Sequence, residues 1–319
     1  MDARSDGEAG PGLLPGVRRN IELGGRGIIG YREVGMPGSR PTLVLLHGLG
    51  ATADLNFGPL YLALANRYHL IAPDLRGHGS GIRSARPFSF GTCADDVAAL
   101  IDATAGTAPS SAGAYVLGYS MGGPIAMLLA RRRPDLVRGL VLSATAARFG
   151  LDGIGRALMF GAGLVGEAWL RLPSAPGLAR TRWARRLVEV PRIPPLPALD
   201  SLSARLRPVS AAIPQLPHLL VASGNLARFH DAPWLHDLDV PTAVVVTTAD
   251  RLVRPAHQRA LAAAIPGARI VEVEGGHEIC ARHPWRFAAA VSAALRTLGT
   301  PGRPTVRPAA RHSARRSSA

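Results

Sequence analysis

A serine between two glycines is the clearest chemical signal in the sequence. Residues 118–122 read Gly-Tyr-Ser-Met-Gly, which follows the pattern G-x-S-x-G. An apolar run precedes the motif and a helix-like segment follows it, so the chain must turn sharply at Ser120. Such a turn lifts the hydroxyl above a strand end and points the helix N-terminus toward it. The spacing predicts Ser120 as a nucleophile, with the backbone N–H of Met121 as an oxyanion donor.

A histidine suited to act as the base comes late in the chain. His277 follows Gly275 and Gly276 directly after the last expected strand. Twin glycines suit a loop that must present an imidazole toward the serine. Serine is a weak nucleophile at neutral pH, so a base must take its proton in the transition state. We expect His277 to take that proton and then to protonate the leaving group.

The acid that orients this base is expected at the end of another strand. Asp250 lies just past the apolar run 242–248, and ligand-facing residues of an open parallel sheet emerge at such strand ends. Asp237 and Asp239 precede that run, so they should lie at the wrong edge. Asp250 would fix the tautomer of the histidine and stabilise the imidazolium that forms.

A second oxyanion donor is expected from residues 47–50, which read His-Gly-Leu-Gly and follow the apolar run 42–46. A loop in this position can supply a second backbone N–H group, and that of Leu49 is the best candidate. We expect His47 to brace the loop and to take no part in proton transfer.

The elements that must position these residues alternate along the chain. Short apolar runs are separated by helix-like segments, a pattern typical of a parallel sheet with helices on both faces. A strand hairpin is expected over residues 20–33, with Gly24 and Gly25 as its turn. Further strands are expected over 42–46, 68–72, 114–118, 136–142, 242–248 and 269–274, and helices over 60–65, 93–103, 122–133, 257–264 and 284–298.

The alternation breaks at about Phe149, which predicts an insertion. Residues 150–235 open with an apolar helix-like stretch and continue with Arg-rich and Pro-rich stretches. We interpret this segment as a helical cap over the site. We expect a flexible arm over residues 1–18, the two parts of the core over residues 19–149 and 236–298, and a disordered basic tail over residues 299–319.

In these motifs and their order the chain resembles the α/β-hydrolase family. A further match lies in residues 74–81, Asp-Leu-Arg-Gly-His-Gly-Ser-Gly, which is similar to the D-x-R-G-x-G-x-S loop of that family, with Ser80 one place early. The resemblance implies an α/β-hydrolase fold, with a mostly parallel central sheet, helices on both faces and a helical cap insertion. The chain order of Ser120, Asp250 and His277 fits this fold. The serine mechanism needs no cofactor and no metal, so none is expected.

The serine at position 120 also narrows the reaction. Family members that act as haloalkane dehalogenases or epoxide hydrolases use an aspartate nucleophile, so both are disfavoured. We expect a carboxylic ester hydrolase that acts on a small acyl or lipid-like substrate through an acyl-enzyme. Apolar cap residues suited to line an acyl pocket are Leu158, Met159, Phe160, Leu164, Val165, Trp169 and Leu170.

Other reactions use the same triad and stay open as alternatives. They are those of cofactor-free haloperoxidases or perhydrolases, thioesterases, acyltransferases and carbon–carbon bond hydrolases. A non-catalytic binding protein is the alternative of a different class, and the complete set of three triad residues argues against it.

Composition bounds the partners and the compartment. The 319 residues carry a formal net charge of +15, and all 37 basic residues are arginine. A basic, apolar cap fits peripheral contact with a membrane surface, whereas the lack of a nucleic-acid-binding motif argues against nucleic acid. Cys93 and Cys280 have no metal or disulfide spacing, so we interpret them as reduced packing residues of a cytoplasmic protein. No secretory signal or membrane-spanning stretch is visible.

Overall fold

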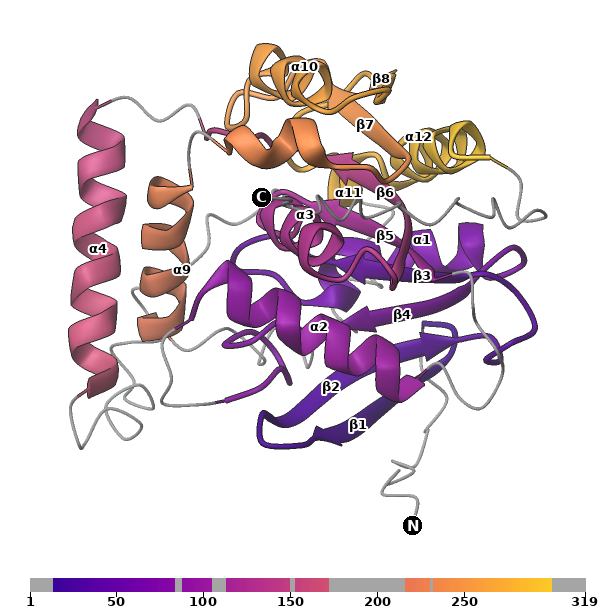
Figure 1. The fold of residues 1–319 in the computed structure, drawn as a ribbon, viewed down its shortest axis with the longest axis horizontal. Coiled ribbons are helices and arrows are strands. Elements are labelled where there is room, and N and C mark those ends of the chain that lie inside the picture. The colour runs from indigo at the N-terminus through magenta and orange to yellow at the C-terminus, as the bar shows by residue number, and fades with distance from the viewer. Residues whose placement is uncertain are drawn as a thin grey trace, which may run out of the picture.

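An eight-stranded sheet runs through the centre of the protein (Figure 1). The computed structural model describes residues 14–83, 88–104, 113–149, 153–171, 216–229 and 232–299. The strand order is β1-β2-β4-β3-β5-β6-β7-β8; β2 runs antiparallel to both of its neighbours, and all other pairs are parallel. The strands are β1 (Val17–Leu23), β2 (Gly27–Val34), β3 (Thr42–Leu46), β4 (His69–Pro73), β5 (Ala114–Tyr119), β6 (Val137–Ser143), β7 (Thr242–Thr247) and β8 (Arg269–Val273).

Helices cover both faces of this sheet, so the chain has two hydrophobic layers (Figure 1). Successive side chains of a strand point to opposite faces: Val44 and Leu46 of β3 belong to one layer, Leu43 and Leu45 to the other. The first layer is shared with α2 (Phe90–Thr104), α3 (Gly122–Arg132) and α10 (Pro255–Ala264), and the second with α1 (Ala53–Leu64), α11 (Ile279–Arg282) and α12 (Pro284–Thr297).

The observed elements confirm the predicted fold class, and most of their bounds lie within three residues of the expected ones. Helix α1 is the main exception, because it begins at Ala53 and not near residue 60. Thr52 caps its N-terminus by accepting a hydrogen bond from the N–H of Leu55 at 3.3 Å. Pro59 lies inside the helix. Because proline is disfavoured within helices, the sequence pattern did not predict the part of α1 that precedes it. The short helix α11 was not predicted, and β1 begins at Val17, within the expected arm.

Two antiparallel helices represent the insertion within the described residues, namely α4 (Gly153–Arg171) and α9 (Leu216–Arg228). Their backbones touch, since a Cβ added to Gly163 would lie 2.6 Å from the Cα of Gly224. Helix α9 lies between α4 and the core (Figure 1), and a Cβ added to Gly50 would lie 3.8 Å from the Cδ1 of Leu219. A 3-10 helix, η1 (Pro233–Asp237), precedes β7. The Arg- and Pro-rich stretches of the expected cap, residues 172–215, and nearly all of the expected tail lie outside the described residues.

A helix that crosses a membrane must be about 20 residues long and predominantly apolar. Within the ranges given above, none is both long enough and apolar enough to span a membrane.

Candidate active site

The turn between β5 and α3 places Ser120 in the left-handed region of backbone space, with φ at 51°. This conformation is costly for a residue with a side chain, and such strain is concentrated at functional sites. The flanking glycines are required by contact: a Cβ on Gly118 would lie 2.6 Å from the carbonyl oxygen of Gly122, and one on Gly122 would lie 2.1 Å from that of Leu46. The close approach of helix and strand therefore needs both glycines, and it leaves Ser120 at the tip of the turn.

Ser120 belongs to a continuous chain of hydrogen bonds with the two other predicted residues. Its Oγ lies 3.0 Å from the Nε2 of His277, and the Nδ1 of that ring lies 2.9 Å from the Oδ2 of Asp250. Asp250 is 3% exposed. The three residues come from three separate strand ends, and the structure brings all of them together.

Asp250 is held by several donors besides the histidine. Its Oδ1 accepts hydrogen bonds from the N–H groups of Leu252 and Val253 at 2.9 and 2.8 Å, and its Oδ2 accepts one from the Thr247 hydroxyl at 3.0 Å. The buried Gln258 of α10 donates to the same hydroxyl at 2.8 Å and accepts from the N–H of Thr247 at 3.0 Å. This network fixes the carboxylate, and the sequence analysis did not identify Thr247 or Gln258.

The His47–Gly50 loop runs directly against the serine. A Cβ on Gly48 would lie 3.3 Å from the Cβ of Ser120. Of the predicted oxyanion donors, Leu49 lies in this loop, next to Gly48, and Met121 follows Ser120 at the N-terminus of α3. Within the described residues, neither of their N–H groups donates to a backbone carbonyl outside the helices and strands.

His47 is buried and occupied on both nitrogens. Its Nδ1 donates to the Gly48 carbonyl at 2.8 Å, and its Nε2 accepts from the N–H of Leu75 at 2.9 Å. Burial lowers the pKa of His47, so the ring is neutral at neutral pH. These contacts tie the oxyanion loop to the loop that follows β4, which is the bracing role expected from the sequence.

The loop over residues 74–81 connects several parts of the core. The buried Asp74 accepts hydrogen bonds from the N–H groups of Ala53 and Ser80, each at 2.9 Å, and from Arg18 at 2.6 Å. It therefore joins the start of α1, this loop and the first strand. Toward α9, a Cβ on Gly77 would lie 2.6 Å from the Cβ of His218, so the loop forms a wall between the core and α9.

The apolar cap residues divide between two faces of α4. Met159 and Leu170 pack against the hydrophobic core. In contrast, Leu158, Phe160, Leu164 and Val165 are exposed. The expectation that these four line an acyl pocket is wrong in this structure, because their side chains face solvent, and the Phe160 ring lies against Arg228 of α9 at 4.8 Å.

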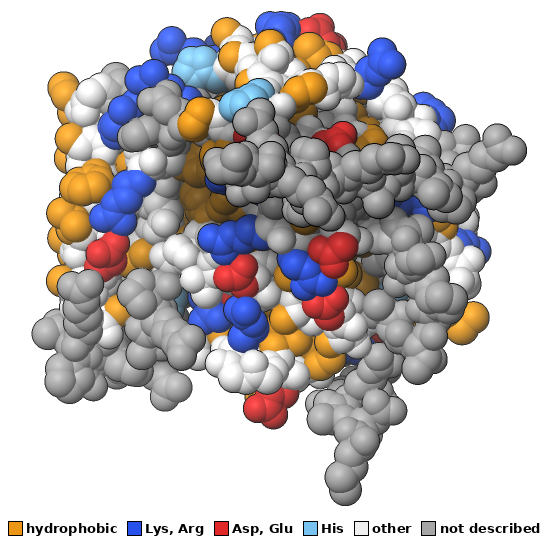
Figure 2. All heavy atoms as spheres, in the orientation of Figure 1, with side chains coloured by type: hydrophobic (Ala, Val, Ile, Leu, Met, Phe, Trp, Pro, Cys, Tyr) orange, Lys and Arg blue, Asp and Glu red, His pale blue; other side chains and the backbone are white. Residues whose placement is uncertain are grey.

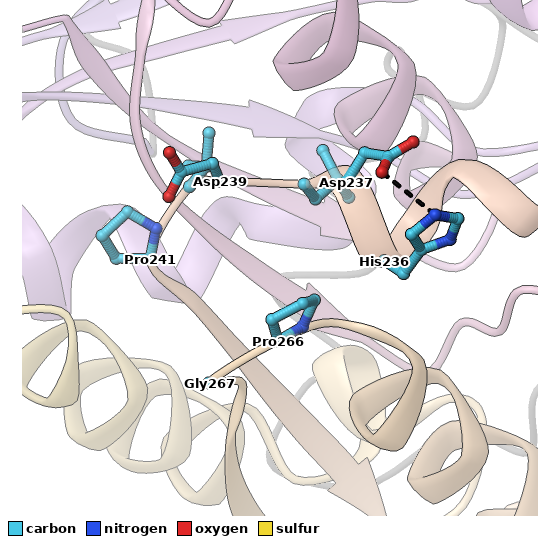
Figure 3. Close-up of a pocket in the computed structure, with 8 residues that line it drawn as sticks. His236, Asp237, Asp239, Pro241, Pro266 and Gly267 are labelled. Carbon is cyan, nitrogen blue, oxygen red and sulfur yellow. Dashed lines mark ion pairs between the residues drawn. The ribbon is translucent and has the colours of Figure 1, made fainter. Parts of the chain in front are cut away.

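The competing acids Asp237 and Asp239 lie far from the serine, as predicted. They line a hollow of about 420 Å³ together with Pro241, Pro266 and Gly267 (Figure 3). Pro241 and Gly267 precede β7 and β8, so the hollow lies at the opposite ends of these strands from Asp250. Asp237 is paired with His236 at 3.0 Å. Among the described residues, no group of three His, Cys, Asp or Glu side chains is placed to hold a metal ion.

His78 provides a test of the wall between the core and α9. Its ring lies 5.2 Å from that of His47 and 6.2 Å from that of Phe88, and burial lowers its pKa to about 3. In the unfolded chain the pKa of this histidine is about 6.5. Between the two pKa values the unfolded chain therefore binds more protons than the folded chain, so the free energy of unfolding falls as the pH drops through this window. This loss amounts to about 2 kcal/mol at pH 5. In urea titrations at pH 7 and pH 5, the free energy of unfolding of His78→Gln should fall less than that of the wild type by about this amount. An equal decrease in the free energy of unfolding of the two proteins would contradict the lowered pKa of His78.

Comparison with known proteins agrees with this geometry. The model of the "Alpha/beta hydrolase family" matches residues 43–294. A pimeloyl-[acyl-carrier protein] methyl ester esterase from Neisseria meningitidis is 32% identical over 258 residues, which cover 80% of this chain and 92% of the relative.

Solved structures show the same architecture. An enol-lactonase from Burkholderia xenovorans LB400 superposes with a TM-score of 0.67 at 25% identity, covering 87% of this chain and 99% of the other. A hydrolase from Pseudomonas aeruginosa PA01 gives a TM-score of 0.65 at 26% identity, covering 87% and 98%. The chain therefore belongs to the alpha/beta hydrolase family.

Proposed function

We propose that this protein is a serine-dependent carboxylic ester hydrolase that works through an acyl-enzyme. The observation that carries the proposal is the hydrogen-bonded chain from Ser120 through His277 to Asp250, with distances of 3.0 and 2.9 Å. A nucleophile, a base within hydrogen-bonding reach and a third group that orients the base are the geometric requirements of this chemistry.

In the acylation step, the Oγ of Ser120 attacks the ester carbonyl carbon while its proton passes to the Nε2 of His277. The Nδ1–H group of the ring donates to Asp250, so Nε2 is the nitrogen available to accept the proton. The carboxylate stabilises the imidazolium that forms. The C–O bond to the alcohol then breaks, and the alcohol leaves with the proton from Nε2.

In the deacylation step, water attacks the acyl-enzyme while His277 takes its proton. The acyl bond to Ser120 then breaks, His277 returns the proton to the Oγ of Ser120, and the acid is released. Both steps place negative charge on the former carbonyl oxygen. The N–H groups of Leu49 and Met121 would donate to this oxygen, and one such donor typically lowers the barrier by about 3 kcal/mol.

The relatives support an acyl ester as the substrate class. The Neisseria relative is named for hydrolysis of a methyl ester, and the Burkholderia neighbour for hydrolysis of an enol-lactone. Both reactions break an acyl C–O bond, as the mechanism above does. Reactions at thioesters, peracids and carbon–carbon bonds use the same catalytic groups. Assays with each of these substrate classes distinguish them from ester hydrolysis.

A series of p-nitrophenyl esters, from acetate to palmitate, tests this function. The wild type should hydrolyse part of the series, and the chain-length optimum gives the size of the acyl pocket. Ser120→Ala should lower kcat on the order of 10⁶-fold, as removal of the serine does in other triads. Asp237→Asn, at the opposite end of β7, is the matched control and should keep wild-type activity. Wild-type rates in Ser120→Ala would contradict the proposal.

The outer face of α4 supports a second proposal, peripheral contact with an anionic lipid surface. Ile154, Leu158 and Val165 recur at helical spacing and are 76%, 69% and 58% exposed. Side chains coloured as hydrophobic lie along this edge of the molecule in Figure 2. Residues 153–229 carry ten arginines against three acids. An apolar helix face on a basic segment suits the boundary between headgroups and acyl chains.

Vesicle co-sedimentation tests this contact. The full chain should bind vesicles that contain phosphatidylglycerol more strongly than vesicles of phosphatidylcholine alone, because the arginines attract the anionic headgroups. The double variant Leu158→Glu/Val165→Glu should lose most of this binding. Met36→Glu, at an equally exposed apolar position outside the cap, should not. Absence of binding by the wild type to the anionic vesicles would overturn this proposal and leave the hydrolase function untouched.

A further inference from the structure

A row of polar side chains connects two loops of the site. Asn56 of α1 accepts a hydrogen bond from the N–H of Gly48 at 2.8 Å, and its amide nitrogen donates to the Cys280 thiol of α11 at 3.6 Å. The hydroxyl of Tyr119 is a hydrogen-bonding neighbour of the same thiol, and it donates to the carbonyl oxygen of His277. The row thus runs from the oxyanion loop to the backbone of the histidine.

The Asn56 end of this row determines which N–H group of the oxyanion loop is available. Gly48 and Leu49 carry consecutive donors, and Asn56 occupies that of Gly48. The donor of Leu49 is then the one left for a substrate oxygen. Because Gly48 packs against Ser120 so closely, a small shift of this loop changes the distance between the donor and the reacting carbonyl.

The other end of the row bears on the base. Tyr119 is adjacent to Ser120 in the chain, and its hydroxyl holds the main-chain carbonyl of His277. Cys280 sits between the two ends, and it is 3% exposed. Neither Asn56 nor Cys280 was identified from the sequence as a partner of the oxyanion loop.

The members of this row are neutral at neutral pH. Burial raises the pKa of the Cys280 thiol to about 11 and raises the pKa of Tyr119 well above its usual value. Both groups therefore keep their protons and remain donors. A neutral row can hold the loops without placing a further charge beside Asp250 and His277, where it would shift the proton equilibrium of the base.

We infer that Asn56, Cys280 and Tyr119 form a positioning relay, which holds the oxyanion loop and the histidine loop in register around Ser120. The inference rests on the proposed hydrolase function and adds residues that act through others. Groups that meet the transition state must be held closely, and small misplacements reduce the rate of the chemical step. The relay therefore acts on kcat, with little effect on KM.

The test measures p-nitrophenyl ester hydrolysis by Asn56→Ala, Cys280→Ala, the double variant and Cys280→Ser. Loss of an oxyanion donor costs about 10²–10³ in kcat, so a displaced donor should cost Asn56→Ala about 10–100-fold, with KM within about threefold of wild type. Cys280→Ala should lose kcat in the same way. Cys280→Ser keeps a donor and an acceptor and should recover most of the loss. Cys93→Ala changes the other buried cysteine, in α2, and is the matched control with unchanged kcat.

The double variant decides whether the residues act as one unit. A shared relay predicts that it loses no more than about the worse single variant, whereas independent residues give the product of the two losses. Thermal melts verify that each variant is folded. If Cys280→Ala unfolds, Asn56→Ala still tests the relay, because Asn56 is only half-buried.

The outcomes separate the relay from the function. An active wild type with full kcat in both alanine variants, or with multiplicative losses in the double variant, overturns the relay alone. A wild type inactive on every ester and thioester overturns the proposed function and the relay with it.

Discussion

The close contact of α3 with the ends of β3 and β5 is the constraint on which the rest of the site depends. At Gly118 and Gly122 there is no room for a Cβ, because backbone atoms of neighbouring segments already occupy the space. The helix therefore begins directly at the strand end, and Ser120 must adopt a positive φ of 51° to join them. A looser junction would relieve the strain, but it would withdraw the helix N-terminus and the Met121 N–H from the serine. Strain and electrostatic preparation thus have one cause.

The parallel sheet then determines where the partners of Ser120 come from. Parallel strands end at the same edge, so the segments after β3, β5, β7 and β8 meet there. These segments are held by residues other than Ser120, His277 and Asp250. His47 links the oxyanion loop to Leu75, and Gln258 fixes Thr247 beside Asp250. The site is therefore held by hydrogen bonds between loops, on a frame in which β3, β5 and β7 are buried on both faces.

This division explains what could be predicted from the sequence. The alternation of apolar runs, the G-x-S-x-G spacing and the order of Ser120, Asp250 and His277 are local patterns, and they led to the fold and to residues that the structure brings together. Helix α1 was predicted too short, because Gly58 and Pro59 interrupt the helical pattern that the Thr52 cap and tertiary packing sustain. The supporting groups were missed for another reason. Asn56 and Cys280 are 224 residues apart in the chain, so no spacing rule connects them, and only the folded sheet brings α1 and α11 together.

The most direct test of the account is whether an acyl group becomes attached to Ser120 during turnover. The wild type would be mixed with an excess of a p-nitrophenyl ester that it hydrolyses, quenched in acid within the burst phase, and digested for peptide mass analysis. The account predicts a mass increase equal to the acyl group on the peptide that contains Ser120, at a stoichiometry that approaches one per chain when deacylation is slow. An acyl group on a different residue, or a burst of p-nitrophenol with Ser120 unmodified, would contradict it.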